Sequence, residues 1–117
     1  MLFRSSKETG IPISIIVTQA AHESNWGNSG LAQKANNLFG IKAGGNWVGP
    51  SMTFPTHEVM SGKEITVDAA FRHYSTWEAS VRDWLKFIQG PRYAKAYAAA
   101  LSKDAKMFFY EIGRAHV

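Results

Sequence analysis

The chain has 117 residues, of which 45% are hydrophobic and 13% aromatic, and it contains no cysteine. These values predict one globular domain rather than a disordered chain, and they exclude disulfides and thiolate metal sites. The net charge of +4 favours an anionic partner, but the sequence has no dense Lys/Arg run, no nucleic-acid motif and no apolar run near the roughly 20 residues of a membrane span. We therefore expect a monomer without nucleic-acid partner, membrane span, metal or cofactor.

The first predicted helix opens at Pro12 and ends near Gly27, two residues suited to those positions. Apolar side chains recur along it at helical spacing, and Glu23 falls on the same face. A short helix over residues 31–35 follows, with Asn28 or Ser29 as its N-cap. The predicted apolar face consists of Ile13, Ile16, Val17 and Ala20.

The middle of the chain predicts extended structure. A turn at Asn36-Asn37 precedes a buried extended segment over residues 38–41 and a glycine-rich loop. From residue 52 to 74 the apolar pattern has period two, and Ser61-Gly62-Lys63 is the expected hairpin turn. Pro55 limits its strand to an edge position. The other strand places on one face Ile65, Val67, Ala69 and Phe71.

The last third of the chain predicts helices again. Ser75 and Glu78 fit a capping box, Gly90-Pro91 ends the helix that follows and starts the next, and Ser102 caps a last helix that Gly113 ends. The apolar stripe after the capping box consists of Trp77, Val81, Trp84, Leu85 and Ile88. The predicted fold class is α+β, a mainly helical body with one inserted β-hairpin lobe.

Glu23 is the residue whose position points most directly to chemistry. A carboxylate on an apolar helix face is desolvated, and the helix C-terminus repels its negative charge. Both effects favour the protonated form, which a general acid needs. Nearby, Trp26 offers a flat face for a sugar ring, and Asn25 offers a donor and an acceptor. The alternative is a boundary carboxylate whose head group reaches solvent.

Several motifs occur in a consistent order along the chain. They are Gly10-Ile11-Pro12, Gln19 to Gly27 (QAAHESNWG), Asn37 to Lys42 (NLFGIK), Trp47-Val48-Gly49-Pro50 and Phe71 to Ser75 (FRHYS). Together they closely resemble the glucosaminidase domains of glycoside hydrolase family 73 over residues 8–113. The resemblance implies a lysozyme-like fold that cleaves the β-1,4 bond between N-acetylglucosamine and N-acetylmuramic acid in peptidoglycan glycan strands.

The resemblance also implies roles for two carboxylates. Glu23 matches the general acid of the family, and Glu58 best matches the second acidic residue, which activates water or stabilises the oxocarbenium-like transition state. Glu64, on the other strand, is the runner-up. Asp68 is expected to form a surface pair with Arg72 instead.

The predicted substrate-binding residues follow from their positions in the motifs. Trp26 and Trp47 are expected to line sugar subsites, whereas Trp77 and Trp84 are expected in the core. Tyr74 either reaches the cleft or closes the hairpin against the helices. The full predicted set is Asn25, Trp26, Asn37, Phe39, Trp47 and Tyr74, with Asn37 and Phe39 shaping the cleft floor.

Other chemistries lack their motifs. The four histidines show no repeated ligand spacing and no His-Glu-x-x-His pattern. Ser24 lacks the Gly-x-Ser-x-Gly elbow of a serine hydrolase. The nearest alternatives to a glucosaminidase are a muramidase, a lytic transglycosylase and a peptidoglycan-binding module without turnover.

The two ends of the chain carry expectations of their own. Family members continue with a Gly-Tyr-Ala-Thr-Asp-Pro segment whose tyrosine belongs to the active site, whereas here Ile112-Gly113-Arg114-Ala115 precedes His116-Val117. We therefore expect a single domain truncated at its C-terminus. The first six residues do not resemble a signal peptide, so a location in the periplasm or cell wall would require an export segment outside this sequence, unless the protein is phage-associated.

Overall fold

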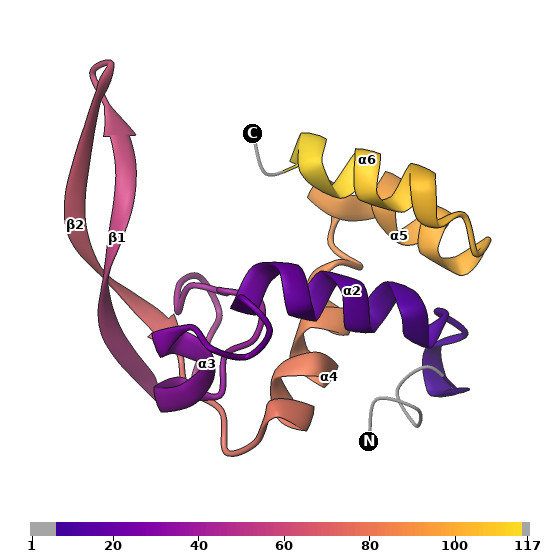
Figure 1. Ribbon diagram of the computed structural model, residues 1–117, viewed down its shortest axis with the longest axis horizontal. Helices are drawn as coiled ribbons and strands as arrows, with labels where there is room; N and C mark the ends of the chain where they lie inside the picture. The colour runs from indigo at the N-terminus through magenta and orange to yellow at the C-terminus, as the bar shows by residue number, and fades with distance from the viewer. Residues whose placement is uncertain (1–6, 116–117) are drawn as a thin grey trace.

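The computed structural model describes residues 7–115 and has a helical body from which a two-stranded antiparallel hairpin projects (Figure 1). This arrangement confirms the predicted α+β class with an inserted β-hairpin lobe. Among the described residues, no helix has the length and apolar character that a membrane crossing requires. The elements are α2 (Ile13–Ser24), α3 (Gly30–Ala35), β1 (Ser51–Met60), β2 (Lys63–Arg72), α4 (Trp77–Phe87), η1 (Pro91–Tyr93), α5 (Ala94–Leu101) and α6 (Ala105–Ala115).

Helix α2 crosses the middle of the body, between α4 and the α5–α6 pair (Figure 1). Its buried face differs from the predicted one, because Ile13 and Val17 are 38% and 40% exposed. Apolar residues occupy so wide an arc of this helix that spacing alone does not identify the core side. The buried side chains are Ile15, Ile16, Gln19, Ala20 and Ser24.

The core joins the segment after α3 to helices α2, α4, α5 and α6. Phe39 stacks on Trp84 with ring centroids 4.5 Å apart, and Phe108 of α6 meets the same indole edge-on at 6.1 Å. The predicted buried segment over residues 38–41 is confirmed, since Leu38, Phe39 and Ile41 are each about 5–6% exposed. Burying these side chains is the main stabilising contribution to the body.

The hairpin has a two-residue turn at Ser61 and Gly62, whose φ angles are +52° and +77°. Two successive positive φ angles give the turn whose twist matches a β-hairpin. On β2 the predicted face is confirmed, and its burial increases from Ile65 near the tip, 37% exposed, to Phe71 at the base, 5% exposed. The base therefore anchors the lobe, and the tip projects from the body (Figure 1).

Two predicted caps are wrong by one or two residues. Helix α4 is capped by Thr76, whose hydroxyl accepts from the Ala79 N–H at 3.0 Å, and not by Ser75. At α6 the Asp104 carboxylate accepts from the Met107 N–H. The Ser102 hydroxyl instead donates to carbonyls of α5. Neighbouring Ser, Thr and Asp residues are all good caps, so sequence alone does not choose among them.

Candidate active site

The segment that follows Glu23 is a tight turn built by Ser24 and Gly27. The buried Ser24 hydroxyl donates to the Ala20 carbonyl at 2.6 Å and accepts from the Gly27 N–H at 2.9 Å. Gly27 has φ +79°, and a Cβ there would lie 2.8 Å from the Trp77 ring. The turn therefore requires a small residue in left-handed backbone conformation, and it fixes the end of the helix that carries Glu23.

Asn25 and Trp26 lie in this turn with φ angles of +51° and +58°. Asn25 is the C-cap of α2, and its N–H bonds to the Ala21 carbonyl. The Trp26 side chain is 80% exposed and lines a hollow on the outer side of α2 with Thr18 and His22. Both predicted substrate-binding side chains thus face solvent next to Glu23, but Trp26 faces a different side of the helix.

Glu23 is exposed in this structure, contrary to the predicted desolvation on the apolar face of α2. The physical reason is that the core covers the Ile15–Gln19 side of the helix, which leaves residue 23 at its margin. The buried Gln19 amide donates to Glu23 Oε1 at 3.1 Å. This bond orients the carboxyl group and leaves its second oxygen for the solvent side.

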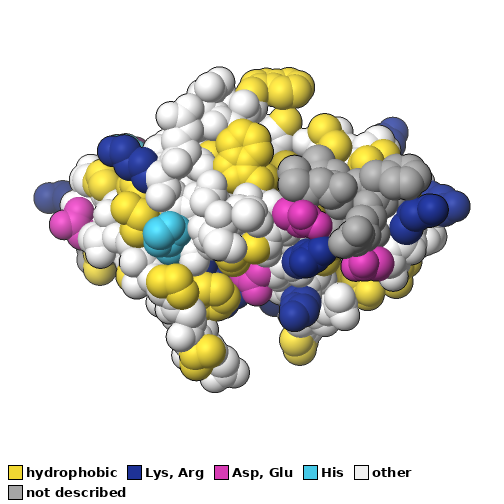
Figure 2. Space-filling view, turned by 90° about the horizontal axis from the view of Figure 1, so that it is seen from below, with side chains coloured by type: hydrophobic (Ala, Val, Ile, Leu, Met, Phe, Trp, Pro, Cys, Tyr) yellow, Lys and Arg dark blue, Asp and Glu magenta, His cyan; other side chains and the backbone are white. Residues whose placement is uncertain are grey.

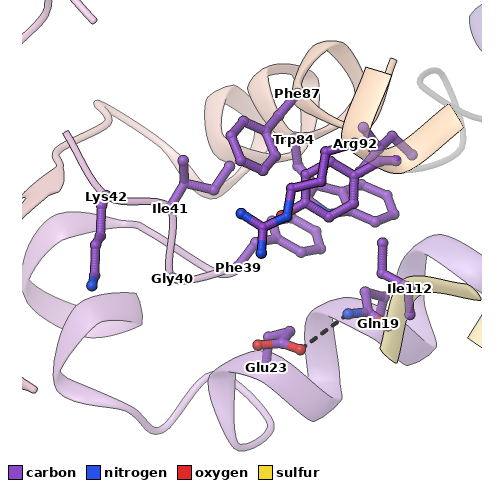
Figure 3. Close-up of a pocket in the computed structure, with 12 residues that line it drawn as sticks. Gln19, Glu23, Phe39, Gly40, Ile41, Lys42, Trp84, Phe87, Arg92 and Ile112 are labelled. Atoms are coloured by element: carbon purple, nitrogen blue, oxygen red, sulfur yellow. Dashed lines mark hydrogen bonds between the residues drawn. The ribbon is translucent and has the colours of Figure 1, made fainter. Parts of the chain in front are cut away.

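Two hollows meet at Glu23 and together form a groove along α2. One, of about 290 Å³, runs toward α4 and η1, and the other, of about 610 Å³, runs toward α6. Glu23, Gln19 and Ile112 line both. In Figure 3 the Glu23 carboxyl group faces the first hollow from below, with the Phe39 and Trp84 rings beyond it. A carboxyl group at the middle of an elongated groove suits a polymeric substrate.

The hairpin presents Glu58, and not Glu64, on the side that faces the groove. Glu58 pairs with Ile65 across the strands, on the inner apolar face. Its Oε1 contacts the Nζ of Lys42 at 2.6 Å, and Lys42 lines the first hollow with Glu23. Glu64 pairs with Val59 on the outer face, where it lies 3.4 Å from His57 Nδ1. Of the two candidates, the strand register thus favours Glu58.

The expected surface pair of Asp68 with Arg72 is wrong, because Arg72 instead donates to Asp83 Oδ2 of α4 at 2.8 Å. The side chains of Arg72 and Asp83 are only 14% and 21% exposed. The Arg72 Nε also donates to the Lys42 carbonyl at 3.1 Å. This arginine therefore links the base of the hairpin to α4 and to the groove wall.

Tyr74 lies inside this junction, 5% exposed, and its hydroxyl donates to Asp83 Oδ2. Burial and the negative charge of Asp83 raise the pKa of the Tyr74 phenol above its ordinary value. Trp47 meets the Tyr74 ring edge-on at 5.6 Å, under the Arg72 guanidinium. The sequence left two alternatives for Tyr74, and in the structure Tyr74 closes the hairpin against the helices instead of reaching the cleft.

Asn37 and Phe39 shape the groove from the segment after α3. Asn37 is 1% exposed, and its amide donates to the carbonyls of Ile41 and Arg72 at 3.0 and 2.9 Å. Its oxygen accepts from the Ile41 N–H. Asn37 thus holds the turn that presents Phe39, whereas the Phe39 ring itself lines the first hollow.

Sequence reasoning missed the two basic residues of the groove, Lys42 and Arg92, which line its first hollow from opposite sides (Figure 3). Lys42 ends the NLFGIK motif, which could have marked it, whereas an arginine after Gly90-Pro91 resembles an ordinary surface charge and has no such signal. Figure 2 shows one face of the molecule, on which Lys and Arg are scattered over both ends and near the middle without forming one patch. Among the described residues, no three His, Asp or Glu side chains gather to hold a metal ion.

A helical body, a hairpin lobe and a glutamate in the groove beside that lobe define a lysozyme-like glycoside hydrolase domain. The glucosaminidase model, described as mannosyl-glycoprotein endo-beta-N-acetylglucosaminidase, matches residues 2–117. The chain therefore belongs to the glucosaminidase family, which confirms the resemblance seen in its motifs.

Similar proteins agree with this assignment. The chain is 38% identical to the peptidoglycan hydrolase FlgJ of Pseudomonas aeruginosa over 120 residues, which cover 98% of this chain and 30% of the relative. It is 49% identical to the exo-glucosaminidase LytG of Bacillus subtilis over 83 residues, 70% of this chain and 29% of the relative. The matched region thus spans less than a third of the length of either relative.

Among solved structures, a peptidoglycan hydrolase mutant from Sphingomonas sp. A1 superposes with a TM-score of 0.81 at 31% identity. The superposition covers 97% of this chain and 75% of that one. The fold is therefore that of known peptidoglycan hydrolases.

Proposed function

We propose that this chain is an endo-β-N-acetylglucosaminidase that cleaves the β-1,4 bond between N-acetylglucosamine and N-acetylmuramic acid in peptidoglycan. The observation that carries the proposal is the position of Glu23, where two hollows meet in one groove beside the hairpin lobe. A glycan strand lying along this groove places a glycosidic oxygen near the free oxygen of Glu23. The site of action is the cell wall or the periplasm.

Glu23 is the general acid in this proposal. Its carboxyl group is exposed to solvent at the groove, and a bound glycan displaces the surrounding water. Desolvation then favours the protonated form, which donates its proton to the leaving oxygen. The Gln19 amide occupies Oε1, so the proton is carried by Oε2.

Glu58 is the second carboxylate, which activates a water molecule or stabilises the oxocarbenium-like transition state. Its place on the inner face of the hairpin supports this role, because Glu58 contacts Lys42, which lines the same hollow as Glu23. The acetamido group of the substrate is the alternative source of assistance.

The proposed substrate contacts divide into two kinds. Phe39 lines the groove, and Asn25 and Trp26 are exposed at the turn after Glu23. Asn37, Trp47 and Tyr74 act from the base of the hairpin, where they fix the shape of the groove.

The test is digestion of purified cell wall, with analysis of the released fragments. Reducing-end N-acetylglucosamine is expected, whereas reducing-end N-acetylmuramic acid would indicate a muramidase and anhydro-muramic ends a lytic transglycosylase. Long fragments support endo cleavage. Disaccharides released from the first minutes would instead support exo cleavage, the activity named for the relative LytG.

Glu23→Gln should lower the release of reducing ends by about 10²-fold or more, because a glutamine cannot donate the proton. Glu58→Gln should also be strongly impaired. Glu64→Gln is the matched control, because this carboxylate lies on the outer face of the same hairpin. Equal solubilisation of cell wall by wild type and Glu23→Gln would refute the catalytic role of Glu23, whereas binding to insoluble peptidoglycan without release of reducing ends would favour a peptidoglycan-binding module.

A further inference from the structure

Lys42 connects the groove to the hairpin lobe. Its side chain lines the hollow next to Glu23, and its ammonium group lies 2.6 Å from Glu58 Oε1. The acid–base roles of Glu23 and Glu58 do not require a cation at this place. Moreover, the cation occupies one of the two acceptor oxygens of the Glu58 carboxylate.

The backbone of Lys42 is fixed, whereas its side chain is not. The residue forms an antiparallel bridge with Phe71, its carbonyl accepts from the Arg72 Nε, and the next N–H, of Ala43, bonds to the Ala70 carbonyl. The Lys42 side chain is 54% exposed and that of Glu58 is 35% exposed. An ion pair this open contributes little stability, so the flexible lysine can change partners at small cost.

A second cation faces the same hollow. Arg92 belongs to η1, on the opposite side of the hollow from Lys42. Its Nε donates to the Ala115 carbonyl at 2.7 Å, and its guanidinium group points into the hollow (Figure 3). Glycans of neutral N-acetylhexosamines offer no anion to two cations. Muramic acid does, because its O3 carries a lactyl ether that ends in a carboxyl group or in a peptide stem with carboxylates of its own.

We propose that Lys42 is a specificity-determining residue that exchanges Glu58 for a carboxylate on the 3-O-lactyl substituent of the substrate. That carboxylate is the lactyl group itself in stem-free glycan, or a carboxylate of the peptide stem. Exchange leaves Glu58 Oε1 free to accept a hydrogen bond from water, so recognition of the muramyl anion also removes the cation that competes for the Glu58 carboxylate. The inference rests on the proposed function and identifies the 3-O-lactyl substituent as the part of the substrate that the site recognises.

Binding to the Glu23→Gln protein tests the exchange without turnover. Three glycans of equal length are compared by calorimetry: a chitooligosaccharide, a stem-free peptidoglycan glycan and a stem-bearing one. We expect a preference for the carboxylate-bearing glycans that Lys42→Met reduces on the order of tenfold, as expected for one charge-assisted hydrogen bond, with chitooligosaccharide affinity unchanged. Preference for the stem-free glycan assigns the lactyl carboxylate, and preference for the stem-bearing glycan alone assigns the stem.

Two further variants separate this role from a general charge effect. Lys42→Arg keeps a cation at the end of a flexible side chain and should keep the preference. Lys34→Met removes the same charge from an exposed position on α3 that does not line the groove, and it should bind all three glycans as the parent does.

Turnover by the corresponding variants with Glu23 intact gives a second readout. Lys42→Met should lower the ratio of kcat/KM for peptidoglycan glycan to that for chitooligosaccharide by a similar factor. The inference is overturned if Lys42→Met weakens binding of all three glycans equally, or if it leaves the preference intact. If wild type cleaves no glycan while the binding preference depends on Lys42, the proposed enzymatic function fails and the recognition role stands.

Discussion

The ion pair between Arg72 and Asp83 offers a direct test of how the hairpin is attached. Asp83→Asn keeps the size of the side chain and an acceptor oxygen but removes the negative charge. The Arg72 guanidinium, 14% exposed, then remains mostly buried without a counter-ion, and the Tyr74 hydroxyl donates to a neutral amide. The expected result is a substantial loss of stability.

The size of the loss follows from the geometry. Breaking a fully buried pair costs about 3–5 kcal/mol, and a hydrogen bond to a charged group about 1.5–3 kcal/mol. Side-chain exposures of 14% and 21% place this pair below the fully buried limit. We expect a decrease in the free energy of unfolding of about 2–3 kcal/mol, which lowers the Tm by roughly 10–20 °C in a domain of this size.

The assay is equilibrium unfolding in urea at pH 7, followed by circular dichroism. Glu78→Gln is the matched control, because it removes the same charge from the same helix. Its partner is Arg82, in an i,i+4 pair whose side chains are 27% and 50% exposed, and its charge lies in the first turn of α4, so a loss of about 1 kcal/mol is expected. If Asp83→Asn loses no more stability than Glu78→Gln at equal m-value, the pair does not anchor the hairpin.

Three further predictions concern single residues around the site. Burial raises the pKa of the Tyr74 phenol above its ordinary value of 10.0. The protonated phenol therefore stabilises the fold fully below pH 10, and this contribution is lost as the pH rises above 10. In urea unfolding, the stability of wild type relative to Tyr74→Phe should fall by about 1.4 kcal/mol per pH unit above pH 10. Gly27→Ala should cost about 2 kcal/mol or more in the same assay, from a Cβ at φ +79° placed 2.8 Å from the Trp77 ring. Trp26 is 80% exposed, so Trp26→Ala should leave the Tm within about 3 °C of wild type. The variant should nevertheless lower the fraction of protein that sediments with insoluble peptidoglycan, and an unchanged fraction would exclude Trp26 from the substrate path.

Local sequence determined much of this molecule. The alternating pattern and Ser61-Gly62-Lys63 predicted the hairpin, although the turn itself is Ser61 and Gly62, because Lys63 already pairs with Met60. Ser29 is the N-cap of α3, one of the two predicted alternatives. The ordered motifs identified the family and pointed to Glu23. These features depend on neighbours a few residues apart in the chain, which periodicity and turn chemistry describe directly.

Contacts between distant segments decided the rest. The core covers the Ile15 side of α2 and leaves Glu23 exposed, strand register turns Glu58 toward the groove and Glu64 away, and Arg72 finds Asp83 eleven residues on instead of Asp68. Lys42 and Arg92, fifty residues apart, meet at one hollow. Sequence periodicity predicts which residues share a face of a helix or strand, but not which segment packs against that face. The partner of a charged side chain is likewise determined only by the folded structure.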